Sequence, residues 1–213
     1  MKIISPSLLS ANFMNISKDI RSLEKAGVKR LHLDVMDGHF VPSLTFGSII
    51  IKSIRQATSC HLETHLMIKN PHKSIDQYIK SGSDTIIIHL ESSINPSEEL
   101  SYIRSKNISA GIAINPDTEV QRLIPLLNYI DYILIMSVQP GKGGQAFISK
   151  TLDKMENVVK IRENRNIMIG VDGGVNLNTI SDVYHTGIDV AIVGSGLFRA
   201  DDLKQRYNDL LNA

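Results

Sequence analysis

The chain has 213 residues, of which 42% are hydrophobic and 21% are charged, and its formal net charge is +1. This balance is typical of a globular protein with enough apolar side chains for a core, and we expect residues 1–213 to form a single domain. The small net charge argues against a nucleic-acid or membrane partner.

The N-terminal segment Met1–Pro6 reaches a proline before the apolar region of a signal peptide could form, and no apolar run approaches the roughly 18 residues of a membrane span. We therefore expect a cytoplasmic protein. The single cysteine, Cys60, excludes an internal disulfide and a zinc site built from several thiolates. It is interpreted as a small residue near the start of a strand.

Short runs enriched in Ile, Val and Leu recur at regular intervals along the chain, and each is typical of a buried strand. Eight strands are predicted: Ile3–Leu9, Leu31–Met36, Leu62–Ile68, Thr85–Leu90, Ala110–Ile114, Tyr132–Val138, Ile167–Val171 and Val190–Val193.

Segments with helical spacing and one polar face lie between these runs, and several end near a glycine. The predicted helices are Ile16–Ala26, Pro71–Lys80, Ser97–Lys106, Thr151–Glu163 and Leu177–His185. The alternation predicts an α/β fold, a single (β/α)8 TIM barrel, shorter than the usual length of about 250 residues. A doubly wound open sheet is the competing architecture.

Two histidines and two aspartates lie at or near the ends of predicted strands: His32, Asp34, His65 and Asp172. The carboxyl ends of the strands in a parallel barrel all point to one mouth. The pattern therefore predicts one metal site with these four ligands. Mixed imidazole and carboxylate ligands suit zinc, iron, manganese or cobalt, so the sequence leaves the identity of the divalent ion open.

Glycine clusters follow the last three predicted strands, within Pro140–Gln145, Asp172–Gly174 and Gly194–Gly196. Glycine lets backbone N–H groups approach an anion, and barrels often hold phosphate in the loops after their last strands. One cluster alone would be weak support, because tight turns also use glycine. Three clusters at consecutive strand ends predict a phosphate site.

Seven motifs are spread over nearly the whole chain: Pro6–Ala11, Leu31–Pro42, His65–Met67, Met136–Val138, Pro140–Phe147, Val171–Gly174 and Gly194–Ser195. Together they resemble the ribulose-phosphate 3-epimerase family. The resemblance implies a metal-dependent barrel enzyme that inverts C3 of D-ribulose 5-phosphate to give D-xylulose 5-phosphate. Family members form dimers or larger rings, so a homo-oligomer is expected.

The resemblance also implies a role for each site residue. His32, Asp34, His65 and Asp172 would bind one divalent ion, and the two aspartates would also be the catalytic acid/base pair. Ser7 and His65 would contact the substrate. The phosphate would be held by Gly141, Lys142, Gly143, Gly144, Gly173, Gly174, Gly194 and Ser195, and the pocket would be lined by Met36, Met67 and Met136.

This assignment agrees with the chemistry of the reaction. Inverting a carbinol carbon next to a ketone requires removing a proton from one face and returning one to the other face of a planar enediolate. Two opposed acid/base groups are needed, and they must begin in opposite protonation states. A divalent ion can neutralise the developing negative charge, and methionines can supply a polarizable wall with little water.

The remaining histidines are interpreted as structural: His61, His72, His89 and His185 as hydrogen-bonded core residues, and His39 as a loop residue. Asp37 precedes Gly38, and Asp-Gly is a strong turn signal, so a turn is predicted there rather than a third catalytic acid.

Three residues depart from the family's usual pattern: Lys142 replaces a phenylalanine in the phosphate loop, Glu63 replaces an aspartate, and Gly170 replaces a longer polar residue. None removes a metal ligand. The changes leave open a related substrate such as D-allulose 6-phosphate. A non-catalytic sugar-phosphate-binding barrel would not need both aspartates. Decarboxylases and synthases that share this barrel typically carry an Asp-x-Lys-x-x-Asp motif, which the sequence lacks.

Overall fold

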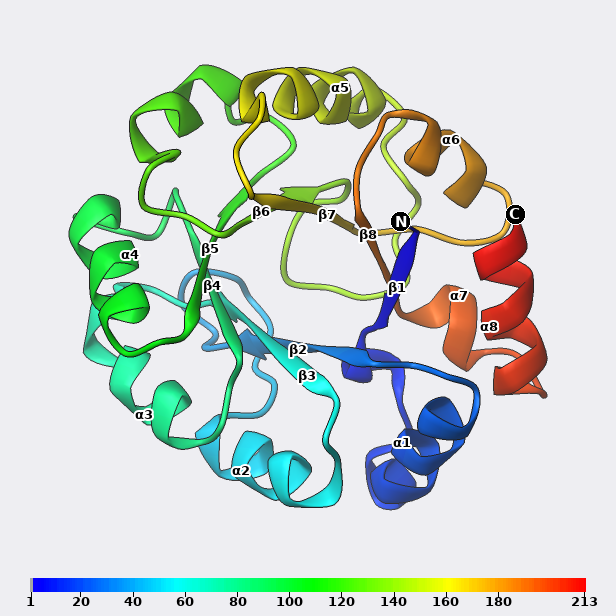
Figure 1. Cartoon of the computed structure of the whole chain (residues 1–213). Coiled ribbons are helices and arrows are strands. Elements are labelled where there is room, and N and C mark those ends of the chain that lie inside the picture. Colours follow the sequence, from blue (N-terminus) through cyan, green and yellow to red (C-terminus); the bar gives the residue numbers. More distant parts are fainter. Residues whose placement is uncertain (1) are drawn as a thin grey trace.

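Eight parallel strands form a barrel surrounded by helices in the computed structural model, which describes residues 2–213 (Figure 1). The hydrogen-bonded order is β1-β8-β7-β6-β5-β4-β3-β2. The predicted TIM barrel is confirmed and the open sheet is wrong, because β1 pairs with β8 and a bridge between Ser7 and His32 joins the two ends of this order. The strands are β1 (Ile3–Pro6), β2 (Arg30–Met36), β3 (His61–Met67), β4 (Thr85–His89), β5 (Ser109–Ile114), β6 (Tyr132–Met136), β7 (Met168–Asp172) and β8 (Val190–Val193).

The helices lie around the outside of the barrel. The α-helices are α1 (Ile16–Lys25), α2 (Ser48–Ala57), α3 (Ile75–Lys80), α4 (Pro96–Ser105), α5 (Thr151–Arg162), α6 (Ile180–His185), α7 (Ser195–Phe198) and α8 (Leu203–Asn212). Short 3-10 segments are η1 (Leu8–Ser10), η2 (Phe13–Asn15), η3 (Pro71–Lys73) and η4 (Val120–Leu126). In residues 2–213, none of the helices has the length and apolar character that crossing a bilayer requires.

Some elements differ from those predicted. Strand β1 ends at Pro6 because the next residues turn into η1. Helix α2 was not predicted, since its run of β-branched isoleucines favours a strand and two of them, Ile49 and Ile50, are exposed. Segment η4 was also missed, because Pro125 interrupts the helical pattern.

The strands alternate between an inner and an outer face, with a period of two residues. In β2, Leu31, Leu33 and Val35 belong to the large core between the sheet and the helices. The intervening residues, including His32 and Asp34, therefore point into the barrel. The polar residues of the site lie inside because their apolar neighbours are buried under the helices.

The glycine at position 170, where a longer residue is usual, is explained by its place on the inner face of β7. A Cβ atom built on Gly170 of β7 would lie 2.1 Å from the Tyr132 hydroxyl of β6. The missing side chain of Gly170 thus leaves room for a large aromatic residue inside the barrel. Within residues 2–213, the buried Tyr132 hydroxyl has no hydrogen-bond partner.

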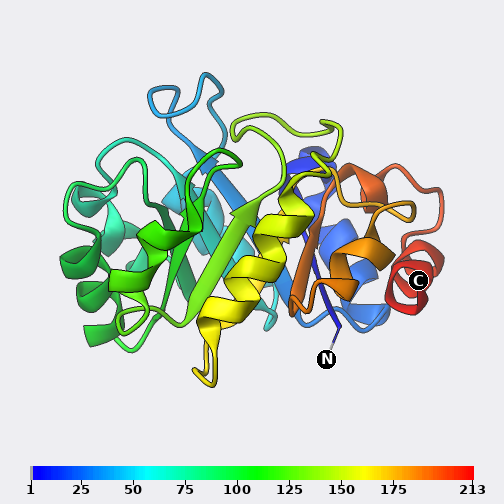
Figure 2. The same ribbon diagram turned by 90° about the horizontal axis from the view of Figure 1, so that it is seen from above.

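The seam between β1 and β2 is where the barrel closes. These two strands, the first and last in the sheet order, are joined by an isolated bridge between Ser7 and His32. A side-chain hydrogen bond from the Ser7 hydroxyl to Asp34 Oδ2, 2.6 Å long, lies beside it. The loops after β2 and β6 rise from the same end of the barrel (Figure 2).

Candidate active site

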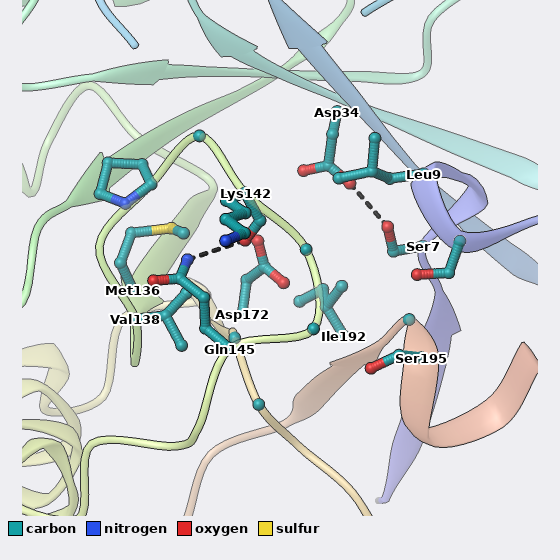
Figure 3. A pocket seen from close by; sticks show the side chains of 18 of the residues that line it. Ser7, Leu9, Asp34, Met136, Val138, Lys142, Gln145, Asp172, Ile192 and Ser195 are labelled. Carbon is teal, nitrogen blue, oxygen red and sulfur yellow. Dashed lines mark hydrogen bonds between the residues drawn. The ribbon is translucent and has the colours of Figure 1, made fainter. Parts of the chain in front are cut away.

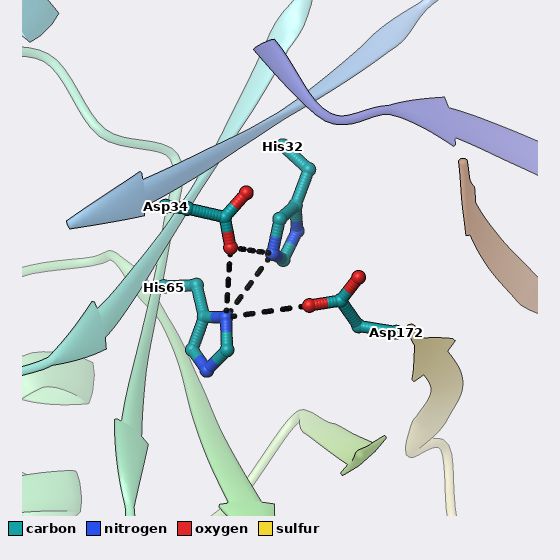
Figure 4. A group of neighbouring side chains, drawn as sticks. All are labelled: His32, Asp34, His65 and Asp172. Carbon is teal, nitrogen blue, oxygen red and sulfur yellow. Dashed lines mark hydrogen bonds and ion pairs between the residues drawn. The ribbon is translucent and has the colours of Figure 1, made fainter. Parts of the chain in front are cut away.

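Four side chains from three strands converge inside the barrel, as predicted (Figure 4). His32 and Asp34 come from β2, His65 from β3 and Asp172 from β7. Each offers one ligand atom, and these atoms all lie within 4.8 Å of one another. The backbone register helps to bring them together, because Asp34 pairs with His65 across β2 and β3.

His65 Nδ1 lies at the centre of this cluster. It is 3.3 Å from Asp34 Oδ1, 3.3 Å from His32 Nε2 and 3.9 Å from Asp172 Oδ2. His32 Nε2 is also 3.5 Å from Asp34 Oδ1. Two imidazole nitrogens and two carboxylate oxygens thus face one point, which is the donor set that a divalent transition metal prefers.

A buried carboxylate supports His32 from behind. Glu63 Oε2 lies 3.2 Å from His32 Nδ1 and accepts a 2.8 Å hydrogen bond from the Ser5 hydroxyl. Its other oxygen is 2.5 Å from Arg30 Nη1. A carboxylate bonded to the far nitrogen of a ligand imidazole orients the ring toward the metal. Glu63, which stands where the family usually has an aspartate, still places a carboxylate in contact with His32.

The environments of the two aspartates are opposite. Burial disfavours ionisation of Asp34, but His32 and His65 outweigh it and hold the pKa of that carboxyl well below its usual range. Burial and the nearby charge of Asp34 raise the pKa of Asp172 to about 7. One aspartate is therefore ionised while the other can carry a proton near neutral pH.

The residues predicted to contact the substrate, apart from His65, line one cavity above this cluster (Figure 3). All predicted site residues except His32 and His65 contribute to its wall; the two imidazoles are fully buried below it. The lining includes Ser7, Asp34, Met36, Met67, Met136, Gly141, Lys142, Gly143, Gly144, Asp172, Gly173, Gly174, Gly194 and Ser195.

The three glycine clusters meet at one side of the cavity. The loop after β6 packs directly on the loop after β7, where a Cβ atom on Gly174 would lie 2.5 Å from the backbone nitrogen of Phe147. Only glycine permits that approach at the positive φ of 69° that Gly174 adopts. Lys142 is exposed in the loop after β6, at the cavity wall.

The structural interpretation of the other polar residues is confirmed in part. Asp37 accepts backbone hydrogen bonds from His39, Phe40 and Lys69, as a turn residue does. His61 bonds to Thr85 and His89 is fully buried. The interpretation of His72 and His185 as core residues is wrong, since both are exposed on the helical surface.

Sequence reasoning missed several residues of the site. Leu9, Ser10, Val138, Gln145, Val175 and Ile192 also line the cavity. His89 contacts His65, and Glu63 contacts His32. The period of two in β3 and β4 was the available signal: residues two positions apart, such as Glu63 and His65, face the same interior.

Comparisons with known proteins agree with this geometry. The model of the ribulose-phosphate 3-epimerase family matches residues 3–198. A ribulose-phosphate 3-epimerase from Aquifex aeolicus is 37% identical over 212 residues, covering 99% of this chain and 96% of the relative. The epimerase from Bacillus subtilis is 35% identical over 210 residues, covering 97% of each chain.

Solved structures show the same fold at low identity. A 3-hexulose-6-phosphate synthase has a TM-score of 0.70 at 16% identity, covering 99% of this chain and 98% of its own. KGPDC from Streptococcus mutans has a TM-score of 0.73 at 13% identity, covering 100% and 96%. At such identity these similarities concern the fold alone.

Proposed function

This chain belongs to the ribulose-phosphate 3-epimerase family and is an epimerase of ribulose 5-phosphate, and from that premise we propose how it works. It interconverts D-ribulose 5-phosphate and D-xylulose 5-phosphate at C3, with one divalent metal ion and two aspartates that move protons. The observation that carries the proposal is the cluster in which Asp34 and Asp172 approach from different strands.

The metal ligands in this proposal are His32, Asp34, His65 and Asp172. The donor set fits zinc, iron, manganese or cobalt, because it mixes imidazole and carboxylate. The fit is supported by the close approach of four possible ligand atoms, which all lie within 4.8 Å of one another in a largely buried place. When bound, the ion supplies Lewis-acid stabilisation of the negative charge that develops on the substrate.

The aspartates divide the proton transfer between them. Asp34 accepts the C3 proton of D-ribulose 5-phosphate, and Asp172 donates one to the opposite face. Their roles reverse for D-xylulose 5-phosphate. The hydroxyl of Ser7, which donates to Asp34 Oδ2, holds that carboxylate in place.

The glycine loops and the methionines bind the substrate. Backbone N–H groups in Gly141–Gly144, with Gly173, Gly174, Gly194 and Ser195, hold the phosphate, and Lys142 lies at the same wall. Met36, Met67 and Met136, each at most 3% exposed, form the apolar surface beside the reacting carbons. Water is thereby kept from the intermediate.

A homo-oligomer and a cytoplasmic location are also part of the proposal. Apolar side chains are exposed near α1 and α2, including Met14 at 90% and Leu44 at 78%, and the Phe13 ring packs on Phe46. Such exposure favours contact with a second copy. Sedimentation analysis of the wild type and of Leu44→Lys tests it; a monomer in the wild type contradicts it.

The experiment for the main proposal combines metal analysis with a coupled assay on D-ribulose 5-phosphate and D-allulose 6-phosphate. We expect a stoichiometric divalent ion and faster turnover of the pentulose phosphate. Preference for the hexulose phosphate would reassign the substrate. Full activity without bound metal would overturn the metal site.

A further inference from the structure

A third buried histidine lies behind the metal-site cluster. His89 ends β4, and its ring stacks on that of His65, with centroids 4.9 Å apart and an interplanar angle of 22°. The two Nε2 atoms are 2.8 Å apart, a hydrogen-bond distance. His89 is fully buried, and the cluster described above does not include it.

A carboxylate holds the other side of the His89 ring. His89 Nδ1 lies 3.2 Å from Glu91 Oε2. Glu91 Oε1 accepts hydrogen bonds from the Asn115 backbone, at 2.8 Å, and from the Thr118 hydroxyl. Burial opposes ionisation of Glu91, but the hydrogen bonds with His89, Asn115 and Thr118 outweigh it and lower its pKa to about 2. Glu91 is therefore an acceptor at neutral pH.

The hydrogen bonds indicate which ring nitrogens of His89 and His65 carry the protons. An ionised Glu91 can only accept, so the facing Nδ1 of His89 carries the proton and its Nε2 has a lone pair. That lone pair must accept from His65, so His65 carries its proton on Nε2. His65 Nδ1 is then free of hydrogen, and its lone pair points at Asp34 and His32.

We propose that Glu91 and His89 are positioning residues that fix His65 in the tautomer whose Nδ1 can bind a metal ion. This inference rests on the proposed metal site. In the opposite tautomer, a hydrogen on His65 Nδ1 would donate to Asp34 and block the ligand lone pair. The nitrogen that binds metal in a histidine is set by the hydrogen bond that the other nitrogen makes.

A third layer of contacts anchors Glu91. The Lys154 ammonium, from α5, donates to the backbone carbonyls of Asn115, Pro116 and Thr118, at 2.7, 2.7 and 2.6 Å. It thus fixes the loop after β5, which supplies both donors to Glu91 Oε1. The two ligand histidines are supported differently on the side away from the metal site. His32 contacts the Glu63 carboxylate directly, whereas the His89 imidazole lies between His65 and the Glu91 carboxylate.

The first experiment reads the tautomers directly, by ¹⁵N NMR of histidine in the metal-free wild type. We expect the His65 proton on Nε2 and the His89 proton on Nδ1. A His65 proton on Nδ1, a His89 proton on Nε2, or a doubly protonated His89 would each overturn the inference. This measurement does not depend on whether any variant folds.

The second experiment uses Glu91→Gln, which keeps the shape but adds an N–H donor. Asn115 and Thr118 both donate to Oε1, so the amide oxygen should face them and the amide nitrogen should face His89. Both histidines should then reverse their tautomers. Metal affinity, measured by chelator competition with Zn²⁺ and Co²⁺, should fall by about 10- to 100-fold, the usual effect of such outer contacts.

The matched control is His61→Gln, which removes another imidazole bond between β3 and β4, that of His61 to Thr85. It should leave the His65 tautomer and the metal affinity unchanged. Wild-type affinity in folded Glu91→Gln would overturn the inference while leaving the metal site standing. No Zn²⁺ or Co²⁺ binding by the wild type would instead overturn the proposed metal site itself.

Discussion

Asp34 and Asp172 reach into the barrel from β2 and β7, and their pKa values are displaced in opposite directions. The displacement follows from what surrounds each carboxyl: the pKa of Asp34 is lowered by the imidazoles of His32 and His65 in spite of its burial, and that of Asp172 is raised by burial and by the charge of Asp34. Two identical side chains thereby begin with different protonation states. The same pair supplies two of the four proposed metal ligands, so metal binding and proton transfer involve the same carboxyls.

Replacing either aspartate with asparagine should remove one proton carrier while keeping its shape. We expect Asp34→Asn and Asp172→Asn each to lower epimerisation by at least the roughly 100- to 10,000-fold that general acid–base catalysis contributes. In heavy water, Asp172→Asn should still exchange the C3 hydrogen of D-ribulose 5-phosphate without inverting it, and Asp34→Asn should exchange that of D-xylulose 5-phosphate. Near-normal epimerisation by both metal-loaded variants would contradict the mechanism.

Removal of the metal should abolish turnover. Exhaustive chelation is expected to inactivate the enzyme, and added Zn²⁺, Fe²⁺, Mn²⁺ or Co²⁺ should restore activity, because the ion stabilises the developing charge. His65→Ala should weaken metal binding because it deletes one of four ligands. His185→Ala, an exposed histidine outside the site, is the control. Activity at verified zero metal content contradicts this prediction.

Metal affinity should increase with pH, through neutrality and above it. Below about pH 7 the metal-free protein keeps a proton on Asp172, which the ion must displace, so acid weakens binding. Burial disfavours the charged form of His32, but Asp34 and Glu63 outweigh it and raise its pKa, which adds a second proton to displace. Competition titrations between about pH 5.5 and 8 measure this dependence; a flat profile is the contrary result.

The glycine loops should determine affinity for the phosphate. Gly144 has a positive φ of 71°, and a β-branched side chain there distorts the loop. Gly144→Val should therefore raise KM with a smaller effect on kcat. Gly187→Val is the matched control, because Gly187 also has a positive φ but lies outside the cavity lining. An unchanged KM in Gly144→Val would place the phosphate elsewhere.

Gly170 and Tyr132 should be coupled in stability. Gly170→Ala forces a methyl group against the Tyr132 hydroxyl and should cost about 1–3 kcal/mol of unfolding free energy. Tyr132→Phe alone should be neutral or stabilising, because within residues 2–213 that buried hydroxyl lacks a partner. Urea unfolding of the double variant should show a smaller loss than Gly170→Ala alone. Strict additivity would argue against the contact.

The sequence could predict the barrel and the four clustered residues because both depend on local patterns. Buried strands appear as apolar runs, and strand ends in a parallel barrel share one mouth. The supporting contacts were less accessible. His89 has the same sequence signature as any strand histidine, and its importance comes from the 2.8 Å approach to His65, which depends on tertiary packing. Helix α2 was missed because burial of Ile51 and Ile54 outweighs the strand preference of β-branched residues.

The position of the barrel seam links folding to chemistry. Asp172 on β7 and the ligands on β2 and β3 lie far apart in the sheet order and meet only because the sheet curls until β1 reaches β2. A chain arrested before that last closure would hold the metal ligands in two separate groups and would not bind the ion tightly. The rate at which the refolding chain binds metal would therefore report when the barrel closes.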